Sequence, residues 1–369
     1  MSAKRTRVFF AGGGTGGHLY PGLAIARALV RRAPHIEPFF IGAERGIERD
    51  ILPGAGFPYA LLSLHPLYRK APWNNWRTMF GAIGAWRAIS HMAADSPPLA
   101  VLGTGGYAAG VALAWARAHA VPTALHEPDS RPGLTTRVFA AGARDVYLGF
   151  PEAAQRLRTS PTARVLPLGC PIEPPPAMRQ SRVDARRAWG LPDDAFIVLA
   201  FGGSQGARAL NEALAHWCAL GLPDGVAVIW GTGRAEHARN AKHDGPTVRV
   251  RAYLAPIADA YAAADIAIAR AGAMSIAELC AWGVPSVLVP LPSAAQDHQT
   301  FNARTLESSG AAIHLPQSAL TAQSIDATIR ELMARPVTLD AMRTAALLRA
   351  RPGAADDIAR AFVDMLHSV

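Results

Sequence analysis

A glycine-rich turn near the amino terminus is the part of the sequence with the clearest chemical potential. The motif GGGTGGH at 12–18 follows an apolar run at 8–11 and precedes a helical pattern at 21–32. Glycines permit positive φ and let a ligand approach the main chain. The helix that follows would present N–H groups and the positive end of its dipole to an anion. His18 stands at the mouth of this turn, where an imidazole could exchange a proton near neutral pH.

A second glycine turn, GGSQG at 202–206, follows the buried strand predicted at 196–201. Two such turns on two α/β halves are typical of two-domain enzymes that transfer a sugar from a sugar nucleotide. One loop would cradle the donor diphosphate and the other the phosphates of the acceptor. The first turn also contains G-x-G-x-x-G, but its acidic companion, Glu44, lies past the second strand. A dinucleotide site is therefore disfavoured.

Three polar clusters follow other predicted strands. His126-Glu127-Pro128-Asp129 lacks further metal ligands nearby, which favours a hydrogen-bonding or charge role. Ser275 and Glu278 have the spacing of a capping box, but the Glu278 carboxylate could instead accept hydrogen bonds from a ribose diol. The segment 297–302 could contact sugar hydroxyls or simply begin a helix.

These clusters need a parallel sheet to bring them together. Strands are predicted at 8–11, 38–41, 99–102, 123–125, 146–149, 196–201, 226–230, 248–250, 266–269, 286–290 and 312–315. Helices are predicted at 21–32, 44–55, 75–94, 108–119, 180–189, 207–219, 254–263, 275–282, 297–308, 322–334 and 354–367. This alternation indicates an α/β fold of two Rossmann-like domains with parallel sheets, with ligands at the carboxyl ends of the strands and the active cleft expected between the domains.

The proline-rich stretch 167–179 divides the chain into the two expected domains. We expect an N-terminal Rossmann-like domain at 1–166 and a C-terminal Rossmann-like domain at 180–350. The remaining segment, 351–369, is predicted to be a helix that packs at the domain junction.

The composition narrows the classes of partner. The net charge is +9 and the pI about 10.0, but no long basic run suggests a nucleic-acid arm. The three cysteines are far apart, so the pattern indicates neither a zinc site nor a disulfide framework. The basic N-terminus leads into a short strand and is not expected to be a signal peptide. No apolar stretch is long enough to span a bilayer.

The segment 62–89 combines aromatic and basic residues: Leu64, Leu67, Tyr68, Arg69, Lys70, Trp73, Trp76, Arg77, Met79, Phe80, Ile83, Trp86 and Arg87. One interpretation is a patch that rests on an anionic membrane surface. The other is a core helix with a solvated basic face.

Six motifs, in order, resemble those of the MurG family of glycosyltransferases. They are GGGTGGH at 12–18, GTGGY at 103–107, HEPDSRPGLT at 126–135, GGSQGAR at 202–208, RAGAMSIAE at 270–278 and DHQTFNA at 297–303. The resemblance covers almost the whole chain. It implies a GT-B fold and an inverting, metal-independent enzyme without a cofactor, which moves N-acetylglucosamine from UDP-N-acetylglucosamine to lipid I, the undecaprenyl-diphosphate-linked muramyl peptide, to make lipid II for peptidoglycan. It also implies peripheral attachment to the anionic cytoplasmic face of the inner membrane, and thus favours the membrane interpretation of 62–89.

The same resemblance assigns the acceptor and the membrane contact to the domain at 1–166 and UDP-N-acetylglucosamine to the domain at 180–350. It also assigns the candidate site residues. Those on the acceptor side are Thr15, Gly16, Gly17, His18, Tyr107 and Glu127. Those on the donor side are Ser204, Gln205, Gly206, Ile257, Met274, Ser275, Glu278, His298, Gln299 and Asn302. His18 is the leading candidate for the general base, with Glu127 and Asp129 as alternatives. His18 could instead bind the acceptor phosphate or fix the loop.

Two positions depart from the family pattern. Asp129 stands where the family has asparagine, and Glu173 stands where it has an arginine near the donor diphosphate. Either Glu173 turns away and Arg208 or Arg270 substitutes, or donor binding is altered. Cys170 is expected to be a packing residue. Two alternative functions remain open: a UDP-N-acetylglucosamine 2-epimerase, and a degenerate, non-catalytic relative that binds sugar nucleotides.

Overall fold

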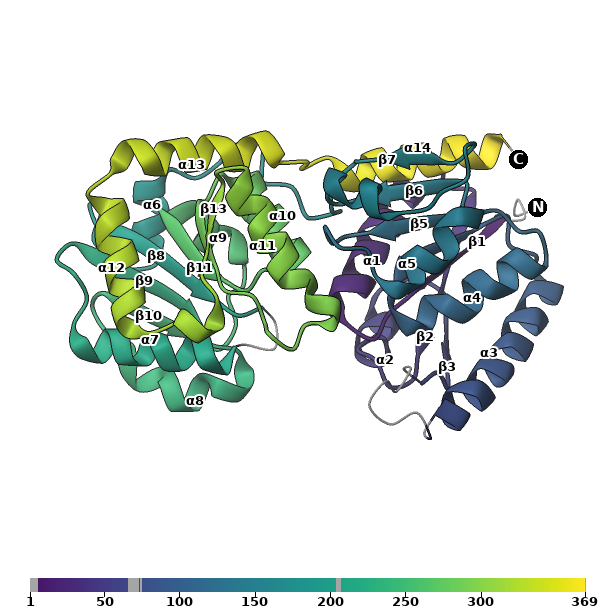
Figure 1. The fold of residues 1–369 in the computed structure, drawn as a ribbon, viewed down its shortest axis with the longest axis horizontal. Coiled ribbons are helices and arrows are strands. Elements are labelled where there is room, and N and C mark those ends of the chain that lie inside the picture. The colour runs from purple at the N-terminus through teal and green to yellow at the C-terminus, as the bar shows by residue number, and fades with distance from the viewer. Residues whose placement is uncertain (1–5, 66–72, 74, 204–206, 369) are drawn as a thin grey trace. The chain divides into compact units, whose positions relative to one another are not determined.

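The computed structural model describes residues 6–65, 73, 75–203 and 207–368 and divides into two compact units. Unit 1 comprises Met1–Ile172 together with Gly353–Val369, and unit 2 comprises Glu173–Pro352. The chain first passes from one unit to the other between Ile172 and Glu173, within the predicted linker, where residues 167–176 form neither helix nor strand. The final helix returns to unit 1 (Figure 1).

Unit 1 is built on a seven-stranded parallel sheet with the order β3-β2-β1-β4-β5-β6-β7. Its strands are β1 (Thr6–Gly12), β2 (Ile36–Ala43), β3 (Tyr59–Leu62), β4 (Val101–Gly105), β5 (Thr123–Glu127), β6 (Asp145–Leu148) and β7 (Arg164–Leu166). Its helices are α1 (Gly16–Arg32), α2 (Glu48–Ile51), α3 (Asn75–Asp95), α4 (Gly106–Ala118), α5 (Leu134–Phe139) and α14 (Ala354–His367).

Helices cover both faces of this sheet. Alternation along β1 sends Val8 and Phe10 to the face covered by α1 and α14, and sends Phe9 and Ala11 to the face covered by α3 and α4. A strand buried on both faces must be apolar throughout, which explains the continuous run VFFA. The core of unit 1 therefore fixes the position of the turn that follows β1.

Unit 2 contains a six-stranded parallel sheet with the order β10-β9-β8-β11-β12-β13. Its strands are β8 (Phe196–Phe201), β9 (Val226–Gly231), β10 (Val248–Arg251), β11 (Ile266–Ala269), β12 (Ser286–Leu288) and β13 (Ala312–His314). Its helices are α6 (Arg182–Ala188), α7 (Arg208–Leu220), α8 (His237–Asn240), α9 (Ile257–Ala263), α10 (Ala273–Trp282), α11 (His298–Ser308), α12 (Ala322–Met333) and α13 (Pro336–Arg349). Helices α7, α12 and α13 pack on one face, and α6, α9 and α10 on the other.

The structure confirms the parallel α/β architecture and corrects several elements. Prediction from sequence missed β3, β7, α5, α8 and α13. β3 and β7 are short strands at the two edges of their sheet, where one-sided pairing leaves only a weak apolar pattern. The predicted helix at 44–55 was wrong in length: α2 ends at Ile51, and Pro53 and Gly54 lie in the short 3-10 turn Leu52–Gly54 that follows it. None of the helices in the described part of the chain is long and apolar enough to cross a bilayer.

The C-terminal helix α14 is an integral part of unit 1. Phe362 is fully buried, and its ring meets that of Phe10 on β1 edge to face with centroids 6.3 Å apart. Arg31 near the end of α1 also bonds to Asp356 on α14 at 2.8 Å. This ion pair is exposed and contributes little. The apolar contact therefore holds the helix in place.

We expect Phe362→Ala to lower the free energy of unfolding of unit 1 by roughly 3–5 kcal/mol, because it removes a buried ring and leaves a cavity. Denaturant unfolding of the full chain measures this loss. Arg360→Ala, at an exposed position of the same helix, is the control and should change stability by less than about 0.5 kcal/mol. Equal effects of the two variants would show that α14 is not part of the core.

Candidate active site

The predicted loops of unit 1 lie together at the point where the order of the strands reverses. β1 and β4 are neighbours in the sheet, yet the chain passes through β2 and β3 on one side of β1 before it reaches β4 on the other. The loops that follow two such strands diverge, and ligands bind in the crevice between them. The glycine turns after β1 and β4 occupy this place. The Gly13 N–H donates to the Gly105 carbonyl at 3.3 Å, which joins the two turns directly.

Each of the two turns depends on glycine at one position in particular. Gly14 has φ of +88° and lies under the ring of Tyr107, so a Cβ there would come within 2.7 Å of the ring. Gly106 has φ of +77°, and a Cβ there would lie 2.1 Å from the Gly13 carbonyl oxygen. The close approach of the two turns thus excludes side chains from both. Tyr107, a predicted site residue, is placed beside the first turn by this packing.

His18 is held at the start of α1 by contacts on two sides. Its Nδ1 lies 3.1 Å from Thr15 Oγ1. Its ring lies so close to the Gly105 backbone that a Cβ at Gly105 would be 2.6 Å from Cδ2. If Nδ1 carries the proton and donates to Thr15, Nε2 has the lone pair that a general base needs. Gly16 and Gly17 form the first turn of α1, where helical N–H groups point away from the helix and can meet an anion.

Glu127 ends β5 and holds the third loop of unit 1. Its two carboxylate oxygens accept hydrogen bonds from the N–H groups of Asp129 at 3.1 Å and Gly133 at 2.9 Å. Farther along the same loop, the Thr135 hydroxyl donates to the Gly106 carbonyl at 3.0 Å and joins this loop to the second turn. Burial, followed by the nearby charge of Asp129, raises the pKa of Glu127 to about 7. The geometry gives Glu127 a loop-holding role and makes it a weaker candidate than His18 for the base.

His126, one residue earlier, is fully buried beneath this loop. Burial lowers its pKa to about 4, and the nearby His18 contributes in the same direction. The His126 ring is therefore neutral at physiological pH, and it adds no positive charge close to His18.

Sequence reasoning missed Glu48. This residue begins α2, has no exposed surface, and its Oε1 accepts the Gly14 N–H at 2.5 Å. Burial raises the pKa of its carboxyl. Glu44, which the sequence analysis considered, is exposed instead. The signal that could have found Glu48 is the flanking glycines Gly42 and Gly46, whose missing side chains leave room for its carboxylate.

Unit 2 repeats this arrangement at the reversal between β8 and β11. The loop after β8 holds Ser204, Gln205 and Gly206, which lie outside the described residues. The loop after β11 leads into α10. The two donor-side motifs at 202–208 and 270–278 thus follow adjacent strands.

Glu278 does not form a capping box with Ser275. α10 begins at Ala273 with Gly272 as its N-cap, so Ser275 and Met274 already lie inside the first helical turn. Instead, the Tyr261 hydroxyl on α9 donates to Glu278 Oε2 at 2.7 Å. The pKa of Glu278 is raised mainly by burial, and the charge of Glu173 adds to the shift. The carboxylate is thus oriented by a tyrosine that sequence reasoning did not identify.

The polar residues at the start of α11 differ in their burial and in their hydrogen-bond partners. Gln299 Oε1 accepts the Leu291 N–H at 2.9 Å, and His298 Nδ1 lies 2.7 Å from the Ala295 carbonyl. Both side chains are half-buried. Asn302 is fully buried and donates to the Ala271 carbonyl at 3.1 Å, so it ties α11 to the loop after β11. Ile257 is half-buried at the start of α9.

Comparison with known proteins identifies the family. The chain matches the glycosyltransferase family 28 N-terminal domain over residues 8–148 and the corresponding C-terminal domain over residues 197–358. A curated relative from Desulforudis audaxviator is 39% identical over 95% of this chain and 96% of its own length. Another, from Moorella thermoacetica, is 36% identical over 98% of this chain and its own full length. Both are named UDP-N-acetylglucosamine–N-acetylmuramyl-(pentapeptide) pyrophosphoryl-undecaprenol N-acetylglucosamine transferase.

The chain belongs to the MurG family of glycosyltransferases. Among solved structures, MurG of Acinetobacter baumannii superposes with a TM-score of 0.76 at 26% identity, over 99% of this chain and all of that one. The match in both sequence and fold confirms the GT-B architecture expected from the six motifs.

The arginines that could compensate for Glu173 have other partners. Arg270 is buried, and its guanidinium donates to the carbonyls of Val289 and Pro290 and to Gln317 Oε1. Arg208 pairs with Glu212 one turn along α7, at 2.9 Å on an exposed surface. Use of Arg270 for the donor would break two buried hydrogen bonds and a partly buried one, whereas Arg208 would lose only a weak surface pair. Of these two arginines, Arg208 is the better candidate to compensate for Glu173 near the donor diphosphate.

Cys170 packs as expected. It is buried, with Sγ 3.5 Å from the Pro128 carbonyl oxygen, and it fills the space next to Gly149. It therefore supports the loop that carries Glu127 and Asp129.

The raised pKa of Glu127 predicts a specific pH dependence of stability. Its pKa is 4.5 ordinarily and about 7 in the folded protein, so the native state binds more protons than the unfolded state between these values. Stability from this group is complete below the lower pKa and is lost as pH rises to the upper one. The free energy of unfolding of the wild type, minus that of Glu127→Gln, should therefore fall between these two pH values and level off above them.

Denaturant unfolding at a series of pH values measures this difference. Glu44→Gln, which removes an exposed carboxylate of the same unit, controls for the loss of one negative charge. A difference that is constant with pH would mean that Glu127 ionises normally in the folded protein.

Proposed function

We propose that this protein transfers N-acetylglucosamine from UDP-N-acetylglucosamine to lipid I and so makes lipid II for peptidoglycan. The observation that carries this proposal is the full-length similarity to relatives that bear the name of this transferase, together with all six motifs in order. Unit 1 is the proposed acceptor unit and unit 2 the proposed donor unit.

The reaction is an inverting displacement at the anomeric carbon. The 4-hydroxyl of N-acetylmuramic acid attacks from the face opposite UDP, its oxygen forms the new bond, and the bond to the UDP oxygen breaks with its electron pair. The attacking hydroxyl loses its proton to a base, and negative charge develops on the leaving diphosphate. The protein's own groups can supply both the base and the stabilisation of the negative charge on the leaving diphosphate.

His18 is the proposed base. Thr15 orients its Nδ1, and the glycine backbone at Gly105 holds its ring, so Nε2 is the atom that would take the proton. The N–H groups at the start of α1 are proposed to bind the diphosphate of the lipid-linked acceptor.

The donor is proposed to bind at the loops after β8 and β11. The carboxylate of Glu278 would accept hydrogen bonds from the ribose hydroxyls, and Gln299 with His298 would contact the sugar. Asn302 is better suited to hold the loop than to contact the sugar, since it is fully buried. Ser204, Gln205 and Gly206 are proposed to meet the diphosphate.

The two alternative functions have less support. The six motifs and the names of the full-length relatives favour the transferase over a 2-epimerase. The retained His18 and Glu278, both held in defined orientations, favour an active enzyme over a degenerate one.

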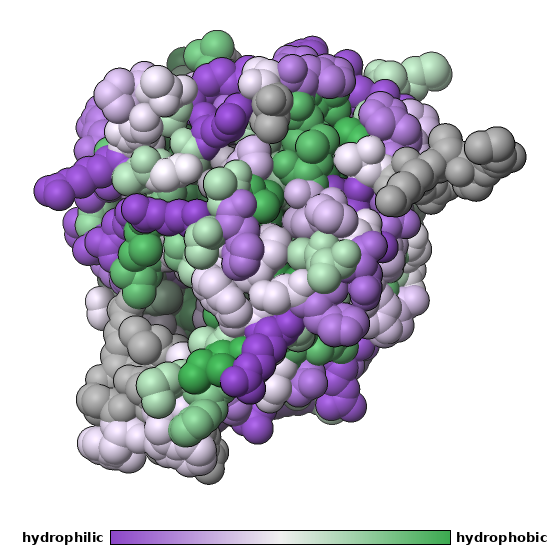
Figure 2. All heavy atoms as spheres, turned by 90° about the vertical axis from the view of Figure 1, so that its right-hand side faces the viewer, coloured by the Kyte–Doolittle hydropathy of each residue, from purple (hydrophilic) through white to green (hydrophobic). Residues whose placement is uncertain are grey.

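A peripheral association with an anionic membrane surface, at the cytoplasmic face of the inner membrane, is also proposed. Its support is the apolar patch of α3, which we define as Trp73, just before the helix, and the exposed residues Trp76, Met79, Phe80 and Ile83 in its first half. In Figure 2, apolar side chains gather beside long hydrophilic ones toward the bottom of the view, where the first half of α3 lies in Figure 1. Leu67, Tyr68, Arg69 and Lys70, which the sequence analysis also assigned to the patch, lie outside the described residues.

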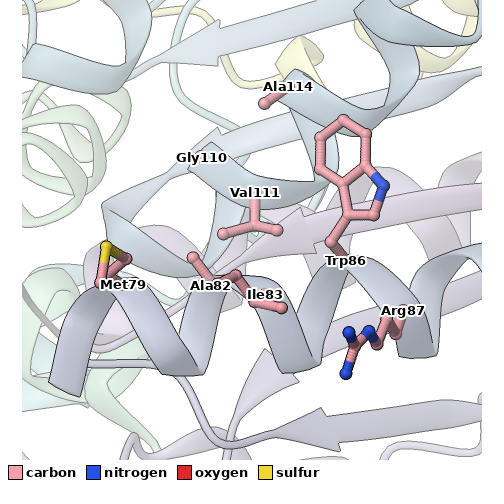
Figure 3. A pocket seen from close by; sticks show the side chains of 8 residues that line it. All are labelled: Met79, Ala82, Ile83, Trp86, Arg87, Gly110, Val111 and Ala114. Atoms are coloured by element: carbon pink, nitrogen blue, oxygen red, sulfur yellow. The ribbon is translucent and has the colours of Figure 1, made fainter. Parts of the chain in front are cut away.

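A hollow of about 430 Å³ between α3 and α4 continues the patch. Figure 3 shows Trp86 reaching from α3 toward α4 and Val111 pointing back, whereas Arg87 points to the other side. An apolar hollow flanked by exposed aromatics and a cation suits the boundary between lipid tails and anionic headgroups.

We expect the wild type to form product from labelled UDP-N-acetylglucosamine and a short-chain lipid I analogue, and His18→Ala to abolish transfer while binding of the donor survives. The reason is that His18 belongs to unit 1 and the donor is proposed to bind unit 2. His35→Ala, at an exposed histidine of unit 1, is the control. Near wild-type turnover of His18→Ala would exclude His18 as the base.

We expect Trp76→Glu combined with Phe80→Glu to reduce binding to vesicles that contain anionic lipid, as measured by co-sedimentation. Two carboxylates would oppose both the apolar and the electrostatic attraction. Val337→Glu with Leu348→Glu introduces the same charges at exposed apolar positions of α13 in unit 2 and is the matched control. Unchanged binding of the α3 variant would contradict the membrane proposal.

A further inference from the structure

The most unusual buried group outside the proposed chemistry is the carboxylate of Glu48. It has no exposed surface, and its Oε2 is a buried oxygen for which the structure shows no hydrogen-bond partner among the described residues. Its Oε1 accepts the N–H of Gly14, in the middle of the first glycine turn. A buried carboxyl with an unsatisfied oxygen is costly, so its retention calls for a function.

Three glycines surround this side chain. A Cβ at Gly13 would lie 1.2 Å from Glu48 Oε1, and one at Gly46 would lie 1.7 Å from Oε2. A Cβ at Gly42 would lie 2.9 Å from that of Glu48. The chain thus makes room for a carboxylate behind the turn from three separate positions, which no apolar core contact would require.

The contact decides which N–H groups of the turn can meet a ligand. Gly14, with its positive φ, directs its N–H back to Glu48 and away from an incoming anion. The N–H groups available to a phosphate are then those of Gly16 and Gly17, at the start of α1. The same contact fixes the chain just before Thr15, whose hydroxyl orients His18.

We propose that Glu48 is a positioning residue for the transfer reaction: by anchoring Gly14 from behind, it sets the turn that presents the α1 N-terminus and His18 to the acceptor. This inference rests on the proposed function for its kinetic consequence, although the anchoring itself does not. Burial raises the pKa of the Glu48 carboxyl, in keeping with its enclosed position behind the turn.

The inference is tested with Glu48→Ala and Glu48→Gln in the full chain. Glu48→Ala should lower kcat/KM for the lipid I analogue by about 100-fold, because a loop displaced by about 1 Å no longer aligns the reacting groups. The dissociation constant for UDP-N-acetylglucosamine should not change. Glu48→Gln keeps an acceptor oxygen for Gly14 and should recover most of the loss. Glu44→Gln is the control on the same segment.

A double variant shows whether the loss of acceptor turnover depends on the position of the Glu48 carboxylate. Gly46 is not among the glycines with positive φ, and the three atoms nearest to a Cβ there all belong to the Glu48 carboxylate. Gly46→Ala should impair acceptor turnover in the wild type and have little further effect in the Glu48→Ala background. An equal loss in both backgrounds would overturn the proposal.

Hydrogen exchange of the peptide that covers 12–18 gives a readout independent of activity. Exchange at this turn should be faster in Glu48→Ala than in the wild type and close to the wild type in Glu48→Gln. Unchanged exchange in Glu48→Ala, or a loss of donor binding equal to the loss of acceptor turnover, would overturn the positioning role. If the wild type forms no product while exchange responds as expected, the proposed function fails and the anchoring stands.

Discussion

The backbone of the first glycine turn is packed closely at Gly13 and Gly14, and the proposed acceptor site depends on these contacts. Glu48 bonds to Gly14 from behind, the Tyr107 ring covers Gly14, and the Gly105 carbonyl accepts the Gly13 N–H. Such close approach requires that no side chain intervene, which explains the run of glycines better than flexibility does. A turn held this firmly is a preorganised ligand site, in which little ordering is left to be done on binding.

Buried or half-buried carboxylates are hydrogen-bonded within the functional segments of both units. Glu48 anchors the first turn, Glu127 the third loop of unit 1, and Glu278 is held by a tyrosine in unit 2. Burial raises the pKa of all three. In each case the recorded partners are N–H or O–H donors, which orient a carboxyl without adding a positive charge beside a phosphate site. The loops are thereby shaped without competing cations.

Much of this could be predicted from the sequence, and the exceptions have physical reasons. Long buried strands such as β1 and β8 were placed correctly because burial on both faces makes them continuously apolar. The loops after β1, β4 and β5 could be expected to meet, because parallel strands share one carboxyl edge. Glu48 could not be found in this way, since its role depends on a tertiary contact across 34 residues. Tyr261 was missed for the same reason, and Ser275 was misplaced because α10 begins three residues earlier than the capping pattern suggested.

The central claim is that this chain builds a β-linked disaccharide on a lipid-linked acceptor, and the structure of the product tests it most directly. Purified protein would be incubated with UDP-N-acetylglucosamine and a short-chain lipid I analogue, and the anomeric configuration of the new linkage determined by NMR spectroscopy. The account predicts a β-linked N-acetylglucosamine on the 4-hydroxyl of the muramic acid and release of UDP. An α-linked product, an epimerised sugar formed from the donor alone, or no reaction of the folded wild-type protein would contradict it.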